Sequence, residues 1–174
     1  FSIDSKIQLQ ILFGAKNGVE NYISKLNFKN FNNKKIKKIY LARDELADRR
    51  KIVNYSLLKN FLKKKDFYIL DPSKISIINL ILLMKDVEHV VMQSGSSMSA
   101  LYYIKKKAKV LNIHNQTGSS DIWVEEISNF LGFDYFLYRG DNTETKKIHN
   151  LKDNSNFKID LVKFEHCYNL FINS

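Results

Sequence analysis

The sequence holds one cysteine, Cys167, in 174 residues. A single cysteine excludes an internal disulfide framework and a cysteine-based zinc site, and it favours a reducing compartment. Long apolar runs are also missing. The longest, Ile75–Met84, is interrupted by Ser76 and Asn79 and is too short for the roughly 18 residues of a membrane span. We therefore expect a cytoplasmic protein, with association at a membrane surface left open.

Proline and glycine are scarce, at one and six residues. No stretch rich in serine, glycine or proline divides the chain, so the sequence predicts one domain over residues 1–174. Within it we expect a helical lead-in over 1–35, an α/β core over 36–140, and a polar segment with a C-terminal helix over 141–174. Apolar residues make up 44% of the chain, which is enough to build a buried core.

Acidic residues are fewer than basic ones, 18 against 28, which gives a net charge of +10. Such a charge attracts phosphates, nucleic acid or anionic lipid without selecting among them. Only four of the cations are arginines, and three of these, Arg43, Arg49 and Arg50, fall within eight residues. Arginine binds phosphate in a bidentate way, so this window is a candidate anion site. The alternative is a surface ion pair with a carboxylate of the same window.

Short segments rich in β-branched and aromatic residues alternate with stretches of helical periodicity. The expected strands are 36–41, 67–70, 89–92, 109–113 and 135–138. The expected helices are 52–62, 77–87, 98–105, 122–131 and 161–172. Connections of this length favour parallel pairing through right-handed crossovers. The predicted fold is an α/β, doubly wound, mainly parallel Rossmann-like sheet with helices on both faces.

Polar residues follow the expected strands. In an open parallel sheet, ligands bind beyond the carboxyl ends of the strands. Arg43 follows the first strand, Ser94–Ser97 follow the third, His114 ends the fourth and Arg139 follows the fifth. Arg50 lies seven residues beyond Arg43, about two turns if that segment is helical. We expect these residues to meet at one edge of the sheet.

The segment Ser94–Ser99 joins an expected buried strand to a helix through Gly95. Its small residues let backbone N–H groups at a helix start approach an anion, and the helix dipole adds to the attraction. The segment is neither a Walker loop nor a G-x-G-x-x-G motif, and the simpler interpretation is a serine-capped helix after a tight turn. Combined with Arg43 and Arg50, it predicts a diphosphate site.

Other kinds of site find little support. The four histidines lack metal-ligand spacing, and no D-x-D pair is present to hold a nucleotide-bound divalent ion, so we expect no metal and no other cofactor. Ser94 does not sit in a G-x-S-x-G motif, which argues against a hydrolase. Phosphatase and kinase motifs are missing too. Cys167 shares an apolar helical face with Phe164 and Leu170, which predicts a core position.

The order of these motifs resembles glycosyltransferase family 61, over residues 36–140. The segments that carry the likeness are Leu41–Arg43, Arg50–Asn54, Phe67–Pro72, Val90–Tyr103 and Lys109–Leu111, with a similar Ile159–Leu161 before the last helix. The family includes bacterial capsular polysaccharide proteins and eukaryotic xylosyl- and N-acetylglucosaminyltransferases.

The resemblance implies a GT-B architecture in which this chain is the carboxyl-terminal, nucleotide-sugar-binding lobe, preceded by a second lobe. It implies that Arg43 and Arg50 bind the diphosphate or organise the site, that Asn54 organises a helix start, and that Ser94–Ser97 form the donor loop. The sequence departs from the family's motifs at two places, and both concern the acceptor chemistry and the choice of sugar. The family's Arg-x-Ile-x-Asn-Glu ends here in Tyr55, and its common His-Gly-Ala-Gly loop is replaced by Ser94–Ser97.

The expected function is donor binding in a nucleotide-sugar-dependent glycosyltransferase, a hexosyl- or pentosyltransferase of surface or capsular polysaccharide synthesis. Its partners would be a nucleotide-sugar donor, bound without metal, and a saccharide acceptor. The isolated chain should transfer sugar weakly or not at all, because we expect the general base on the other lobe. The alternative is a non-catalytic basic α/β module that binds nucleic acid or anionic membrane, although the chain has no RNA-binding aromatic signature.

Overall fold

The computed structural model describes residues 35–43, 50–116, 122–143 and 155–174, together with 14, 16–18 and 21. Most of the predicted helical lead-in lies outside these residues and stays a prediction. Arg49 and its neighbouring carboxylates also lie outside them, as does most of the polar segment after residue 143.

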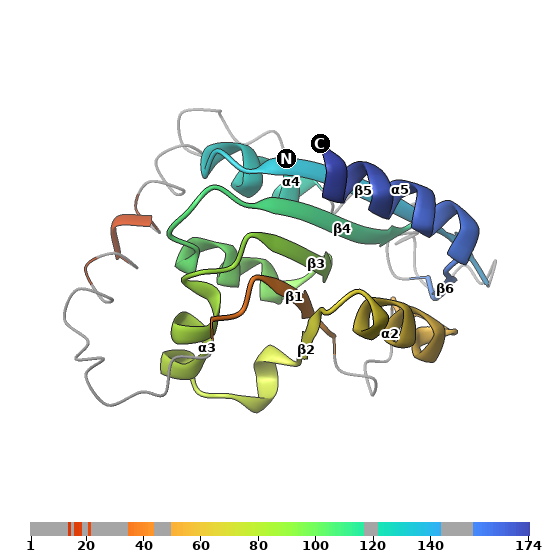
Figure 1. The fold of residues 1–174 in the computed structure, drawn as a ribbon, viewed down its shortest axis with the longest axis horizontal. Helices are drawn as coiled ribbons and strands as arrows, with labels where there is room; N and C mark the ends of the chain where they lie inside the picture. The colour runs from red at the N-terminus through yellow and green to blue at the C-terminus, as the bar shows by residue number, and fades with distance from the viewer. Residues whose placement is uncertain are drawn as a thin grey trace.

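The described residues form a mixed α/β structure (Figure 1). The strands are β1 (Lys38–Leu41), β2 (Tyr68–Leu70), β3 (His89–Gln93), β4 (Lys109–Asn115), β5 (Asp134–Asn142) and β6 (Phe157–Lys158). The α-helices are α2 (Tyr55–Lys64), α3 (Ile77–Met84), α4 (Ile122–Phe130) and α5 (Leu161–Asn173). Two 3₁₀ helices are η1 (Pro72–Lys74) and η2 (Ser96–Tyr103).

The strands form one sheet in the order β2-β1-β3-β4-β5-β6. All neighbours from β2 to β5 pair in parallel, whereas β6 runs antiparallel to β5. The five strands expected from the sequence are therefore present, and their parallel pairing is confirmed. The sixth strand has only two residues, which is too short for a periodic pattern to reveal.

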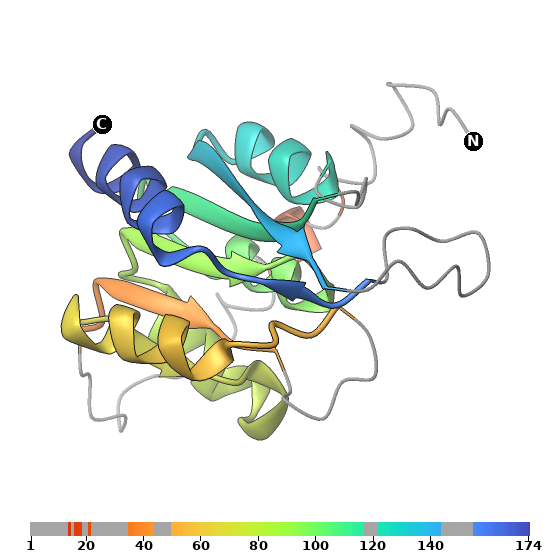
Figure 2. The ribbon, with the colours of Figure 1, turned by 90° about the vertical axis from the view of Figure 1, so that its right-hand side faces the viewer.

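Side chains of each central strand alternate between two apolar clusters on opposite faces of the sheet. In β1, Ile39 and Leu41 belong to one cluster and Tyr40 to the other. The first cluster contains residues of α3, η2 and α4, and the second contains residues of α2 and α5. Helices therefore cover both faces, and Figure 2 shows α2 and α5 on the same side of the sheet.

Helix α3, expected over 77–87, ends at Met84. Two other helices differ from their predicted form because tertiary contacts and local hydroxyl groups override periodicity. The helix expected from residue 52 begins at Tyr55, since Ile52 instead forms a parallel bridge with Phe157. The helix expected over 98–105 is the 3₁₀ helix η2. There the Ser99 hydroxyl donates to the Ser96 carbonyl at 3.0 Å, a local bond that competes with regular α-helical bonding.

Cys167 lies on α5 and is half-buried against the cluster that α2 and α5 form. Its thiol is 3.9 Å from the Leu137 carbonyl oxygen. Burial raises the pKa of the Cys167 thiol, which keeps it protonated and unreactive at neutral pH. The residue therefore packs at the edge of the core rather than inside it, and the predicted apolar face is only partly buried, because Phe164 is enclosed whereas Leu170 is 56% exposed.

Candidate functional site

A cavity of about 670 Å³ lies at the carboxyl ends of β1, β2 and β3. Six of the eight site residues expected from the sequence line it: Arg43, Arg50, Ser94, Gly95, Ser96 and Ser97. The remaining wall comes mainly from Ala42 after β1, from Asp71 and its neighbours after β2, and from Gln93 at the end of β3. We call this the first cavity. The structure thus brings together residues from segments more than fifty positions apart in the sequence.

The first cavity sits where the chain reverses its course across the sheet. From β1 the chain continues through α2 to β2, whereas from β3 it continues through η2 to β4. These connections leave on opposite faces, because α2 and η2 belong to different apolar clusters. Such a switch point opens a crevice between two neighbouring strand ends, and ligands of open α/β sheets bind there.

The backbone around Arg50 is held in an uncommon conformation. Arg50 has φ of +57°, in the left-handed region that non-glycine residues seldom occupy and that costs about 1–3 kcal/mol when it is held. Its carbonyl oxygen accepts a hydrogen bond from the Gln93 side-chain amide. A strained backbone of this kind persists where surrounding contacts hold it. Here the held backbone sets the position from which the Arg50 side chain extends, and Arg50 lines the first cavity.

Strand β6 holds the segment that follows Arg50. Lys51 N–H donates to the Asn156 side chain at 2.8 Å, and the Lys51 carbonyl accepts from Phe157 N–H at 3.0 Å. Val53 N–H donates to the Phe157 carbonyl at 2.9 Å. The unpredicted sixth strand and the residue before it therefore anchor residues 51–53, which follow Arg50 in the wall of the site.

Ser94 and the serines after it contribute differently. Ser94 is 1% exposed, and its hydroxyl donates to the Asn112 side chain at 3.0 Å. Asn112 in turn donates to the Tyr135 hydroxyl at 3.1 Å. The Ser94 side chain thus ties β3 to β4. The segment Gly95–Ser97, which contains the N-cap and the first residues of η2, lines the cavity, and the first N–H groups of a helix have no intrahelical partners.

Asn54 and His114, the other two expected site residues, do not line the first cavity. The Asn54 amide donates to the Ile159 carbonyl at 2.8 Å, and its oxygen accepts from Ile159 N–H at 2.9 Å. The His114 side chain is buried in β4, with its Nδ1 3.2 Å from the Asn115 carbonyl. Asn54 therefore joins the start of α2 to the start of α5.

Replacement of Asn54 by alanine should reduce the free energy of unfolding by about 1–3 kcal/mol, because the peptide group of the buried Ile159 loses both of its partners. Urea denaturation measures this loss. Asn129→Ala, at an exposed position on α4, is the control and should change little. Unchanged stability combined with lost nucleotide binding would instead make Asn54 a ligand-binding residue.

Asp71, which sequence patterns did not single out as a site residue, lies in the wall of the first cavity. Its carboxylate caps η1 by accepting from Ser73 N–H at 3.0 Å and from the Ser73 hydroxyl at 2.7 Å, and it pairs with Lys74 at 3.1 Å. Burial alone would raise the pKa of Asp71, but these bonds and the Lys74 charge outweigh burial and lower the pKa below 3.8. The signal available in the sequence was Asp before Pro72 at a strand end, which is typical of a helix cap.

Asp71→Asn should lower stability at neutral pH, because asparagine mimics the protonated carboxyl group. A folded-state pKa below 3.8 means that ionised Asp71 stabilises the fold above that pH, and that this contribution disappears as the pH falls through the folded-state pKa. Urea denaturation at several pH values should therefore show a difference between wild type and variant that is constant near neutrality and shrinks below pH 3.8. A difference that grows on acidification would contradict the assignment.

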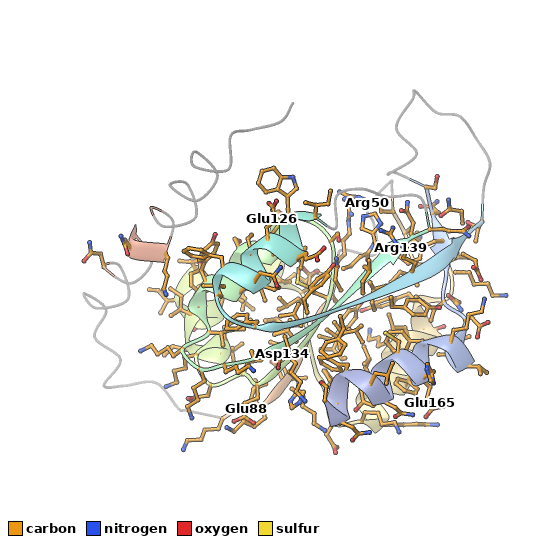
Figure 3. The ribbon with its side chains drawn as sticks, turned by 90° about the horizontal axis from the view of Figure 1, so that it is seen from above. Arg50, Glu88, Glu126, Asp134, Arg139 and Glu165 are labelled. Carbon is orange, nitrogen blue, oxygen red and sulfur yellow. The ribbon has the colours of Figure 1, made fainter. Side chains whose placement is uncertain are left out.

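Charged side chains are distributed unevenly along the strands. Figure 3 shows Arg50 and Arg139 toward one end of the sheet and Glu88 and Asp134 toward the other. Arg139 does not line the first cavity, and its guanidinium donates to the Asn115 carbonyl at 3.3 Å. In the described ranges no group of three His, Cys, Asp or Glu side chains could hold a metal ion. No helix within those ranges has the length and apolarity to cross a bilayer.

The mostly parallel sheet and the arginine-lined cavity at its switch point define an α/β protein with a candidate anion site. The profile of the Glycosyltransferase 61 family matches residues 11–111, more than half of the chain. The chain belongs to glycosyltransferase family 61, which supports glycosyl transfer as its activity, with a donor and an acceptor as substrates. No curated protein matches the chain.

Proposed function

We propose that this chain is the donor-binding lobe of a nucleotide-sugar-dependent glycosyltransferase, and that the first cavity holds the diphosphate of the donor. The observation that carries the proposal is the presence of Arg43, Arg50 and Gly95–Ser97 in one cavity at the switch point between β1 and β3. In this proposal the chain is a doubly wound, Rossmann-like carboxyl-terminal lobe of a GT-B architecture.

The two arginines suit a diphosphate leaving group. In the transfer, an acceptor hydroxyl oxygen forms a bond to the anomeric carbon while the bond from that carbon to the phosphate oxygen breaks. The nucleoside diphosphate leaves with the electron pair, and Arg43 and Arg50 stabilise the negative charge that develops on it. The hydroxyl proton passes to a general base, which we assign to another lobe of the enzyme.

The backbone N–H groups at the start of η2 add to this electrostatic stabilisation. Gly95–Ser97 line the same cavity at this helix start, and preorganised N–H donors require no reorganisation during the reaction. Asp71 is ionised at neutral pH, and a carboxylate accepts hydrogen bonds from sugar hydroxyl groups. We therefore assign Asp71 to the sugar side of the site and the arginines to the diphosphate side.

The biological role we propose is surface or capsular polysaccharide synthesis, with transfer of a hexose or pentose at a cytoplasmic location. Support comes from family membership, since the family that the motifs resemble includes bacterial capsular polysaccharide proteins. Arginine and backbone donors balance the phosphate charge in this proposal, so no metal ion is required.

Calorimetric titration with UDP-, GDP- and CMP-sugars tests the donor-binding role. One nucleotide class should bind, and its free nucleotide should compete. If none binds at millimolar concentration, the proposal is wrong. The alternative role, a basic module for nucleic acid or anionic membrane, predicts instead an affinity for those partners that falls steeply with salt.

A further inference from the structure

A second cavity of about 380 Å³ adjoins the first. Its cationic wall consists of Arg43, Lys59, Lys63 and Lys74, and its one described acidic residue is Asp71. The described side chains therefore give it an excess of three positive charges. The remaining wall includes Tyr55 and the aliphatic chains at positions 69, 70 and 75. A volume of this order suits a single sugar unit with a charged substituent.

The two cavities share part of their wall. Ala42, Arg43 and Asp71 line both, so a ligand in the second cavity lies next to a ligand in the first. In a transferase an acceptor must lie beside the donor for the new bond to form. The second cavity occupies such a position.

The arrangement of the lysines favours an anionic ligand. Lys59 and Lys63 are four residues apart on α2, and like charges at this spacing repel and destabilise a helix. The Lys59 ammonium lies 5.5 Å from the centre of the Tyr55 ring, which holds it at the cavity wall. Among the described residues none forms an ion pair with Lys63. A bound anion would pair with the Lys63 ammonium.

We propose that the second cavity binds the anionic group of the acceptor, a phosphate or carboxylate carried on a sugar. This inference rests on the proposed donor-binding function, because it makes the neighbouring cavity the acceptor side of the same site. The lysines bind the anionic group, and the Tyr55 ring with the aliphatic wall packs against the C–H face of the sugar.

The test is a calorimetric titration with glucose 1-phosphate, glucuronate, inorganic phosphate and glucose, each with and without saturating UDP. Glucose 1-phosphate or glucuronate should bind, and the tighter of the two identifies the source of the negative charge. The double variant Lys59→Gln, Lys63→Gln should weaken that binding about tenfold, at about threefold for each partly exposed charge. The affinity for UDP should stay unchanged.

The matched control is Lys64→Gln with Lys107→Gln, which removes the same charge at two positions outside the second cavity. Equal weakening in both double variants would overturn the inference, as would binding of inorganic phosphate as tight as that of the charged sugars. If UDP binds but the charged sugars do not, only this inference fails. If the charged sugars bind through the lysines but no nucleotide binds, the anion site stands and the donor-binding function fails.

Discussion

Arg43→Ala is expected to weaken nucleotide-sugar binding by about 100-fold, the largest effect of any single substitution in the site. Arg43 lines both cavities and lies directly beyond β1 at the switch point. Its guanidinium can form two charge-assisted hydrogen bonds to a diphosphate. Together they contribute about 3 kcal/mol at the low end of the usual range, and a loss of this size weakens binding by about 100-fold. Calorimetric titration with the preferred nucleotide sugar measures the loss.

Two controls separate the geometry of Arg43 from its charge. Arg43→Lys keeps the charge but loses the planar pair of donors, so it should recover only part of the affinity. Lys107→Ala removes one positive charge near the amino end of β4, where Lys107 pairs with Asp134, and should leave binding unchanged. Equal losses in Arg43→Ala and Lys107→Ala would mean that net charge alone attracts the nucleotide.

Gly140→Ala is expected to lower the free energy of unfolding by about 1–3 kcal/mol, through overpacking of a buried position. A Cβ at Gly140 would lie 2.5 Å from a ring carbon of Phe157 and 2.7 Å from the Lys158 carbonyl oxygen. Phe157 is 1% exposed, so the ring has little room to move away. The added methyl group must therefore push β6 away from β5.

This displacement should also reach the ligand site, because β6 holds residues 51–53 beside Arg50. Gly140→Ala should therefore weaken nucleotide-sugar binding as well as lower the denaturation midpoint in urea. Gly14→Ala, at an exposed helical position where an added Cβ meets nothing within 4 Å, is the matched control; it should leave binding unchanged and should not lower stability, because alanine is favoured over glycine in a helix. Normal affinity in a destabilised Gly140→Ala protein would show that β6 does not position the site.

The sheet and much of the candidate site could be predicted because both depend on local patterns. Apolar runs of strand length predict the five parallel strands. Because ligands bind at the carboxyl ends of such strands, the sequence also predicts that Arg43 and Gly95 lie at one site. Arg50 was harder to place, since its left-handed backbone and its bond to Gln93 depend on tertiary structure. Arg50 nevertheless lines the first cavity, at the edge of the sheet where the sequence predicts it.

Other features could not be predicted because they depend on contacts distant in the sequence. Asn54 binds a peptide group 105 residues away, and nothing near it in the sequence indicates this partner. His114 is buried because helices distant in the sequence cover both faces of β4. Strand β6 exists through pairing with β5 and with residues 51–53. Its two residues carry no pattern of their own.

The second cavity also had no signal in the sequence. In the sequence, nothing distinguishes Lys59, Lys63 and Lys74 from the many other lysines of the chain. Only the packing of α2 and η1 around the end of β2 brings the three lysines to one cavity with Arg43. Surface lysines are usually solvated, so the sequence alone does not predict that these three line one cavity.

The most direct test of the account is a crystal structure of the chain with the nucleoside diphosphate that binds it most tightly. The diphosphate should lie between the Arg43 and Arg50 guanidinium groups, within hydrogen-bond distance of the backbone N–H groups of Gly95–Ser97. A diphosphate bound anywhere else on the molecule, with these groups not in contact with it, would contradict the central claim.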